Sequence, residues 1–257
     1  GSEMCIRDSI CPCHAMTADF SPAPAPGAAP GLRRTRIKIC GLTREQDVAA
    51  AVQAGADAIG FVLYPKSPRH VSIERARELA RGLPAFVTPV LLVVNETPQA
   101  LQDIVRQMPW ATLQFHGDES PSQCEASGHP HIRAARIPLD AGAAGFDLVE
   151  YAKQHAAAQA ILVDAHVSGY GGAGLSFDWN AFNWSHPAIA ASSRLVLSGG
   201  LTPANVTDGI LQVRPWAVDV SSGVEAAKGI KDPGKIQRFV AAVRAADALV
   251  AQSASLD

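Results

Sequence analysis

From residue 36 onward, short apolar runs rich in β-branched residues alternate with longer segments whose apolar residues recur at helical spacing. Such runs favour strands, and the amphipathic segments favour helices. The expected strands cover residues 37–40, 58–63, 87–94, 112–115, 132–136, 161–163, 194–197 and 217–220. A helix is expected after each strand, and the first and last of these helices cover 43–54 and 232–250.

Capping residues mark the expected helix starts. Thr43 and Gln46 fit a capping box, and so do Ser120 and Gln123. Ser72 is expected to cap a helix that reaches about residue 81. Proline after a capping residue gives the same signal, because the N–H at the first helical position has no partner. This pattern occurs at Thr97-Pro98, Thr202-Pro203 and Asp232-Pro233.

About eight such units follow one another in 257 residues. Alternating strands and helices predict parallel strands with right-handed crossovers. Eight units of this length predict an α/β fold of the TIM-barrel type, a closed (β/α)₈ barrel in a single domain over residues 36–250. An open doubly wound sheet is the alternative.

The two ends are expected to lie outside the barrel. Residues 1–35 lack periodicity, and four prolines alternate with alanine and glycine between residues 22 and 30, which predicts a flexible tail. Residues 251–257 form the expected C-terminal tail, and no fused partner domain is expected. Cys11-Pro12-Cys13-His14 lacks a second ligand pair at a suitable spacing, so no metal site is expected.

Composition excludes several classes of protein. Apolar residues make up 47% and charged residues 18%, which is typical of a soluble globular protein. The net charge of −2 gives no indication of a nucleic-acid or membrane partner, and no apolar run is long enough to span a bilayer. The start does not resemble a secretory signal. Five cysteines without a disulfide spacing fit the reducing cytoplasm.

Chemistry in such barrels lies at the C-terminal ends of the strands. The candidate residues at these ends are Cys40, Arg69, Gln114, His116, Asp164 and Asp219. Each has a structural alternative, such as a turn carboxylate, a solvated arginine or a small buried thiol. For Cys40, a position beside a helix N-terminus predicts a lowered thiol pKa.

Glycine-rich loops follow three of the expected strands. Ser198-Gly199-Gly200 and Ser221-Ser222-Gly223 follow the last two strands, where barrels frequently bind phosphate through backbone N–H groups. Residues 169–174 match the spacing G-x-G-x-x-G, but they do not join a strand directly to a long helix. We interpret them as a mobile loop over the barrel mouth.

Several segments together resemble the phosphoribosylanthranilate isomerases of tryptophan biosynthesis, over residues from about 36 to 243. The matching segments are 38–43, 55–62, 64–69, 113–117, 163–164, 170–174, 197–201 and 218–225. The resemblance implies a cofactor-free barrel that converts N-(5-phosphoribosyl)anthranilate to 1-(2-carboxyphenylamino)-1-deoxyribulose 5-phosphate. This Amadori rearrangement needs an acid for ring opening and a base for the C2′ proton. Monomers and homodimers both fit.

The resemblance also implies roles for individual residues. Cys40 matches the base, and Asp164 matches the acid. Arg69 would hold the anthranilate carboxylate, and the two glycine loops, with Gly199, Gly200, Ser221, Ser222 and Gly223, would hold the phosphate. Gln114, His116 and Asp219 would contact the ribose or support the residues that do.

Two other functions remain as alternatives. Indole-glycerol-phosphate synthase would need a catalytic lysine, and Lys38 is the only lysine inside an expected strand. Lys38 is expected to point opposite to Ile37 and Ile39 and not to the side of Cys40, so this enzyme is not favoured. A non-catalytic binder of anionic sugars would need neither Cys40 nor Asp164.

Overall fold

The computed structural model describes residues 34–139, 145–166, 176–184, 186, 189 and 194–253. Three expectations fall outside these ranges: the flexible tail up to residue 33, the rejected metal motif at 11–14, and the glycine loop at 169–174. Of the expected C-terminal tail, residues 254–257 also lie outside, whereas the other expected elements and candidate residues lie within the described ranges.

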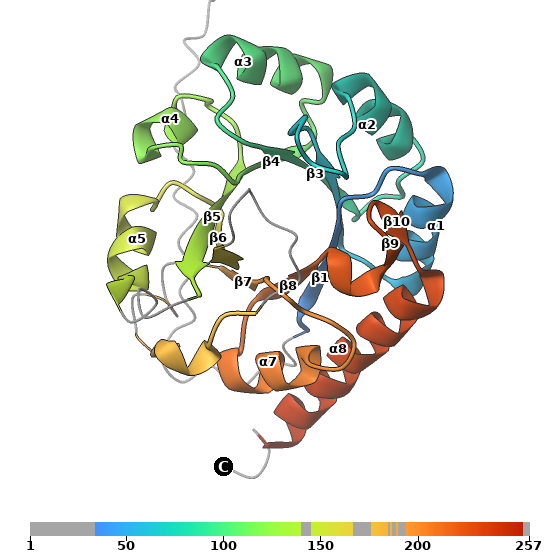
Figure 1. Cartoon of the computed structure of the whole chain (residues 1–257), viewed down its shortest axis with the longest axis vertical. Coiled ribbons are helices and arrows are strands. Elements are labelled where there is room, and N and C mark those ends of the chain that lie inside the picture. The colour runs from blue at the N-terminus through green and yellow to red at the C-terminus, as the bar shows by residue number, and fades with distance from the viewer. Residues whose placement is uncertain are drawn as a thin grey trace, which may run out of the picture.

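Eight parallel strands form a closed barrel in sequence order, and β1 pairs with both β2 and β8. The strands are β1 (Arg36–Cys40), β2 (Ala58–Val62), β3 (Thr88–Val93), β4 (Thr112–Phe115), β5 (His131–Pro138), β6 (Ala160–His166), β7 (Leu195–Leu197) and β8 (Ala217–Val220). Figure 1 shows the strands as an inner ring surrounded by helices. The predicted (β/α)₈ barrel is therefore confirmed, and the open sheet is excluded.

The outer layer consists of α1 (Glu45–Ala54), α2 (Ile73–Ala80), α3 (Pro98–Gln107), α4 (Pro121–Glu125), α5 (Leu148–Gln154), α7 (Val206–Val213) and α8 (Pro233–Ser253). Two short 3₁₀ turns, η2 (Trp179–Ala181) and η3 (Ser222–Val224), and a small hairpin of β9 (Glu225–Ala227) and β10 (Ile230–Lys231) complete the described elements. The hairpin lies beside α1 (Figure 1). It follows β8 directly, so it belongs to the end of the barrel where parallel strands carry their chemistry.

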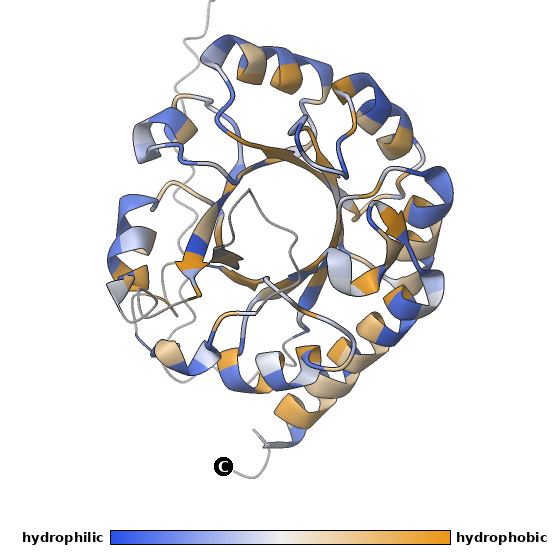
Figure 2. Ribbon diagram, viewed as in Figure 1, coloured by the Kyte–Doolittle hydropathy of each residue, from blue (hydrophilic) through white to orange (hydrophobic). Residues whose placement is uncertain are grey.

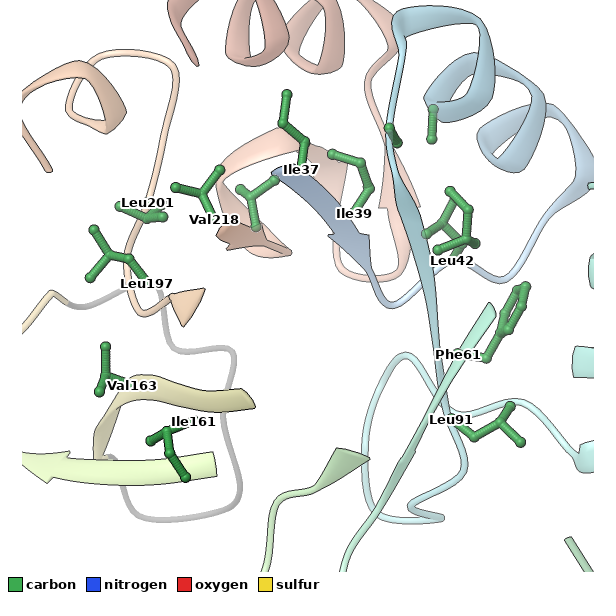
Figure 3. Close-up of a cluster of buried hydrophobic side chains, with 14 of the residues drawn as sticks. Ile37, Ile39, Leu42, Phe61, Leu91, Ile161, Val163, Leu197, Leu201 and Val218 are labelled. Carbon is green, nitrogen blue, oxygen red and sulfur yellow. The ribbon is translucent and has the colours of Figure 1, made fainter. Parts of the chain in front are cut away.

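Alternation along the strands creates two separate apolar layers. Ile37, Ile39 and Phe61 are buried among the residues that face the helices, and Figure 3 shows them around the outside of the strands. The helices turn their apolar faces toward this layer and their polar faces outward (Figure 2). A smaller cluster that includes Ala134 and Leu162 is made by the alternate strand residues. The same alternation sends Lys38 and Cys40 to the side opposite Ile37 and Ile39.

Four predicted helix caps are confirmed, including Asp232, whose Oδ1 accepts from the N–H of Lys235 at 2.9 Å, and two are wrong. The side chains of Ser72, Thr97 and Ser120 each accept a hydrogen bond from the expected backbone N–H, and Ser120 forms the full capping box. Thr43 does not cap α1, because its hydroxyl donates to the carbonyl of Gly229 in the β9–β10 turn. Thr202 does not cap α7, because Asn205 accepts from its N–H and the helix begins only at Val206.

Several boundaries also differ from the prediction, among them the following three. Asp164 lies within β6 rather than after it, because the strand continues to His166. Arg34 and Thr35, assigned to the tail from the sequence, contact the barrel: Thr35 N–H donates to Asp247, and Arg34 pairs with Asp57. The last helix ends at Ser253 rather than at about residue 250.

Within the described ranges, we find no helix that is both long and apolar enough to cross a bilayer.

Candidate active site

Cys40 and Lys38 point to the same side of β1, which corrects the expected orientation of Lys38. They are two residues apart, and in a strand such residues share a face. Both side chains are buried. Gly60 on β2 makes room for them, because a Cβ added there would lie 2.8 Å from Cys40 Sγ and 3.1 Å from Lys38 Nζ. The thiol and the ammonium therefore lie side by side above Gly60.

Asp219 on β8 holds the ammonium of Lys38. Lys38 Nζ lies 2.8 Å from Asp219 Oδ1, and the hydroxyl of Ser198 donates to Asp219 Oδ2 at 3.5 Å. β1 and β8 are neighbours, and their register pairs Lys38 with Asp219. Although burial acts to lower it, the contact with Asp219 raises the pKa of Lys38. The ion pair therefore links β1 to β8, the two strands at which the barrel closes.

The pKa of the Cys40 thiol is higher than the sequence predicted. Burial raises the pKa of Cys40, and the charge of Lys38 only partly opposes this effect. The prediction of a lowered pKa was wrong because Arg44, and not Thr43, precedes α1, and the thiol is enclosed rather than open to the helix N-terminus. Cys40 therefore depends on nearby cations to become a thiolate.

Arg69 lies in the loop after β2, and its guanidinium is already paired. Nε and Nη2 donate to the two carboxylate oxygens of Glu225 at 2.7 and 2.8 Å. Glu225 also accepts from Lys231 Nζ at 2.9 Å, and Lys231 donates to the carbonyl of Ser221 at 3.0 Å. Gly41 allows the close approach of Arg69, since an added Cβ would lie 2.5 Å from Arg69 Cδ. The hairpin after β8 thus fixes the arginine over β1.

Asp164 on β6 lies opposite this group, with His116 beside it. Asp164 Oδ1 accepts from the N–H of Ala165 at 2.9 Å, and Oδ2 lies 3.2 Å from His116 Nε2. His116 Nε2 is not aligned for a hydrogen bond with any described group. Gln114 Nε2 lies 3.1 Å from His116 Nδ1. Because an amide N–H only donates, Nδ1 accepts in this contact.

The two glycine loops meet at the same end of the barrel. Gly199 and Gly200 have φ values of 79° and 65°, a left-handed conformation that suits glycine. A Cβ on Gly199 would lie 2.9 Å from Asp164 Oδ1, and one on Gly223 would lie 1.9 Å from the carbonyl oxygen of Leu201. Ser222 and Gly223 begin η3, where the first N–H groups have no partner within the helix. The first loop therefore lies against Asp164, and the second packs closely on the segment that follows the first.

The candidate side chains predicted from the sequence lie within the barrel strands or in the loops that follow them, and they form two groups. Cys40 and Asp219 share one group with Arg69, whereas Asp164, His116 and Gln114 form the other.

Sequence reasoning missed Lys38, Glu225 and Lys231. The period of two in β1 was sufficient to pair Lys38 with Cys40. Nothing in the local sequence of the hairpin predicted that Glu225 would reach back to Arg69 across 156 positions.

Comparisons with known proteins identify the family. The family model for N-(5'phosphoribosyl)anthranilate (PRA) isomerase matches residues 37–242. The N-(5'-phosphoribosyl)anthranilate isomerase of Leptothrix cholodnii is 60% identical over 215 residues, which cover 84% of this chain and 93% of the relative. The enzyme of Methylibium petroleiphilum is 60% identical over 220 residues, covering 86% and 99%.

Solved structures give the same result. Phosphoribosyl anthranilate isomerase from Thermotoga maritima matches with a TM-score of 0.71 and 38% identity, covering 82% of this chain and 99% of that chain. A phosphoribosyl anthranilate isomerase in complex with reduced 1-(o-carboxyphenylamino)-1-deoxyribulose 5-phosphate matches with a TM-score of 0.65 and 36% identity, with the same coverage. On this evidence, the chain belongs to the N-(5'-phosphoribosyl)anthranilate isomerase family.

Proposed function

We propose that Cys40 and Asp164 carry the two main proton transfers of the isomerisation that this family catalyses in tryptophan biosynthesis. One observation carries the assignment: a buried thiol on β1 and a buried carboxyl group on β6 lie at the same end of the barrel, on strands that are not neighbours. A substrate held between them would meet one group on each side.

The chemistry assigns a role to each group. Asp164 protonates the ring oxygen of N-(5-phosphoribosyl)anthranilate, and the furanose opens to a Schiff base. The Schiff base acidifies the C2′ proton, which Cys40 removes as a thiolate. The resulting enolamine collapses to the ketone. Proton transfers by positioned groups contribute about 10²–10⁴-fold each. His116 Nε2 lies 3.2 Å from Asp164 Oδ2, so the imidazole packs against the carboxyl group.

The remaining residues bind the charged ends of the substrate. Arg69 uses Nε and Nη2 for Glu225, and its Nη1 is available, among the described contacts, for the anthranilate carboxylate. The loops with Gly199, Gly200 and Ser221–Gly223 bind the phosphate through backbone N–H groups. Binding energy from these distant ends orients the reacting carbons.

We also propose that the chain works in the cytoplasm without a cofactor. Two observations support this: among the described residues the thiols of Cys40 and Cys124 are free, and the reaction is acid–base chemistry that needs no redox partner.

Single substitutions at the two groups test the assignment. Cys40→Ala and Asp164→Asn are each expected to lower kcat by about 10²–10⁴-fold. Both variants should still bind the reduced product analogue, measured by calorimetry, because the carboxylate and phosphate contacts remain. Cys124→Ala is the matched control, since Cys124 is buried in the outer apolar layer away from the rim and should keep wild-type kcat. Wild-type turnover by both Cys40→Ala and Asp164→Asn would refute the assignment.

A further inference from the structure

The group around Cys40 contains more positive than negative charge. Lys38, Arg69 and Lys231 are cations, whereas Asp219 and Glu225 are the carboxylates that pair with them. The side chains of all five are less than 10% exposed. Buried charges are stable only when they are balanced, so this enclosed group favours one further anion.

Cys40 is the described side chain placed to supply that anion. Its sulfur lies beside Lys38 Nζ above Gly60, and its carbonyl accepts from Ser221, which in turn contacts Lys231 Nζ at 3.4 Å. Burial lowers the pKa of Lys231, and the charge of a Cys40 thiolate would raise it. The positive charge of Lys231 and the negative charge of a Cys40 thiolate would therefore stabilise each other.

We propose that Lys38 is a positioning residue that stabilises the thiolate form of Cys40 and that Asp219 limits this effect by sharing the ammonium. Lys38 does not itself transfer the proton of the substrate. Its ammonium stabilises the ionised sulfur through a low-dielectric contact, and Asp219 stabilises the ammonium while repelling the same sulfur. The inference rests on the proposed role of Cys40 as the base.

Substitutions of the two partners of this ion pair should shift the thiol pKa in opposite directions, which distinguishes an electrostatic role from a structural one. Lys38→Met leaves Cys40 beside an unpaired carboxylate and should raise the thiol pKa. Asp219→Asn leaves Lys38 with the thiol as its main counter-ion and should lower it. Both changes break the same contact. If the contact were purely structural, the thiol pKa would therefore shift in the same direction in both variants, or would not shift.

The experiment measures alkylation of Cys40 by iodoacetamide against pH in the full unliganded chain. Mass spectrometry of the peptide that contains Cys40 gives the rate, and Cys124 is the internal control. The midpoint of the alkylation rate against pH should rise by about 1 pH unit or more in Lys38→Met and fall by a similar amount in Asp219→Asn. The double variant Lys38→Met/Asp219→Asn, which removes both buried charges, should lie between them.

Three outcomes decide the proposal. Opposite shifts support it, and restoration of the wild-type midpoint by Lys38→Arg would add to that support. Shifts of the same sign, or no shift, overturn it. If Lys38→Met does not fold, Asp219→Asn still decides, because an unchanged or raised midpoint contradicts the coupling. Alkylation requires no turnover, so an active Cys40→Ala enzyme would refute the proposed base without bearing on this result.

Discussion

At the scale of single residues, the site depends on glycines that leave room for the reactive side chains. Gly60 lets Lys38 and Cys40 lie together, and Gly41 lets Arg69 approach β1. Local patterns could predict Cys40 and Asp164 as rim residues, because strand ends are visible in the sequence. They could not predict the pKa of Cys40, which depends on burial and on charges brought from β8 and the hairpin.

Gly60→Ala tests this close packing. The new methyl group would lie 2.8 Å from Cys40 Sγ and 3.0 Å from Cys40 Cα, so β1 or the thiol must shift. We expect a loss of about 1–3 kcal/mol in the free energy of unfolding, together with a lower kcat. Gly82→Ala is the control, because no atom lies within 4 Å of its added Cβ. Urea denaturation and turnover assays of both variants measure the contrast, and equal effects would contradict it.

At the scale of elements, helix starts and strand types were predictable where one local signal acted alone. Ser120 and Gln123 form the predicted capping box, and the additional contact of Ser120 with the hydroxyl of Ser122 is local as well. Thr43 fits the same pattern, but the distant carbonyl of Gly229 takes its hydroxyl. The β9–β10 hairpin was missed because its strands are short, yet it supplies Glu225 and Lys231. A tertiary contact therefore overrode the local signal at Thr43.

The end of α5 should make stability depend on pH. His155 is buried there, stacks on Tyr151 at 4.6 Å, and its Nδ1 has no hydrogen-bond partner among the described residues. Burial, with the charge of Arg133, lowers the pKa of His155 from 6.5 to about 4. Between these pH values the unfolded chain binds a proton that the folded chain does not. The free energy of unfolding should therefore fall as the pH decreases through this window.

His155→Gln should flatten that dependence. Urea titrations at pH 7 and pH 5 measure the difference, and His70→Gln, at an exposed position, should keep the wild-type slope. A slope in His155→Gln equal to that of the wild type would show that His155 is not the group responsible.

At the scale of the whole molecule, the barrel closes by joining its first and last elements. β1 pairs with β8, and α8 holds the start of β1: Thr35 N–H donates to Asp247 at 3.0 Å, and Arg244 donates to the carbonyl of Thr35 at 2.7 Å. Eight repeated units were sufficient to predict this closed architecture. The contact of Thr35 with α8 was not predictable, because the preceding sequence has the composition of a tail.

Asp247→Ala should weaken this closure. The buried N–H of Thr35 would lose its acceptor, which should cost about 1–3 kcal/mol of folding free energy. Thermal denaturation measures the effect, with exposed Asp103→Ala as the control.

By contrast, deletion of residues 1–30 should leave the Tm nearly unchanged. A deletion as destabilising as Asp247→Ala would show that the segment before Arg34 also stabilises the barrel.

The central claim is that Cys40 removes the C2′ proton, and an isotope effect tests it most directly. Serine is a far weaker base at neutral pH, so in Cys40→Ser the proton abstraction should become the slowest step. With substrate deuterated at C2′, we predict a kcat lower than that of the wild type and a larger deuterium isotope effect on kcat. A Cys40→Ser enzyme that turns over at the wild-type rate, or slowly with no increase in the isotope effect, would contradict the account.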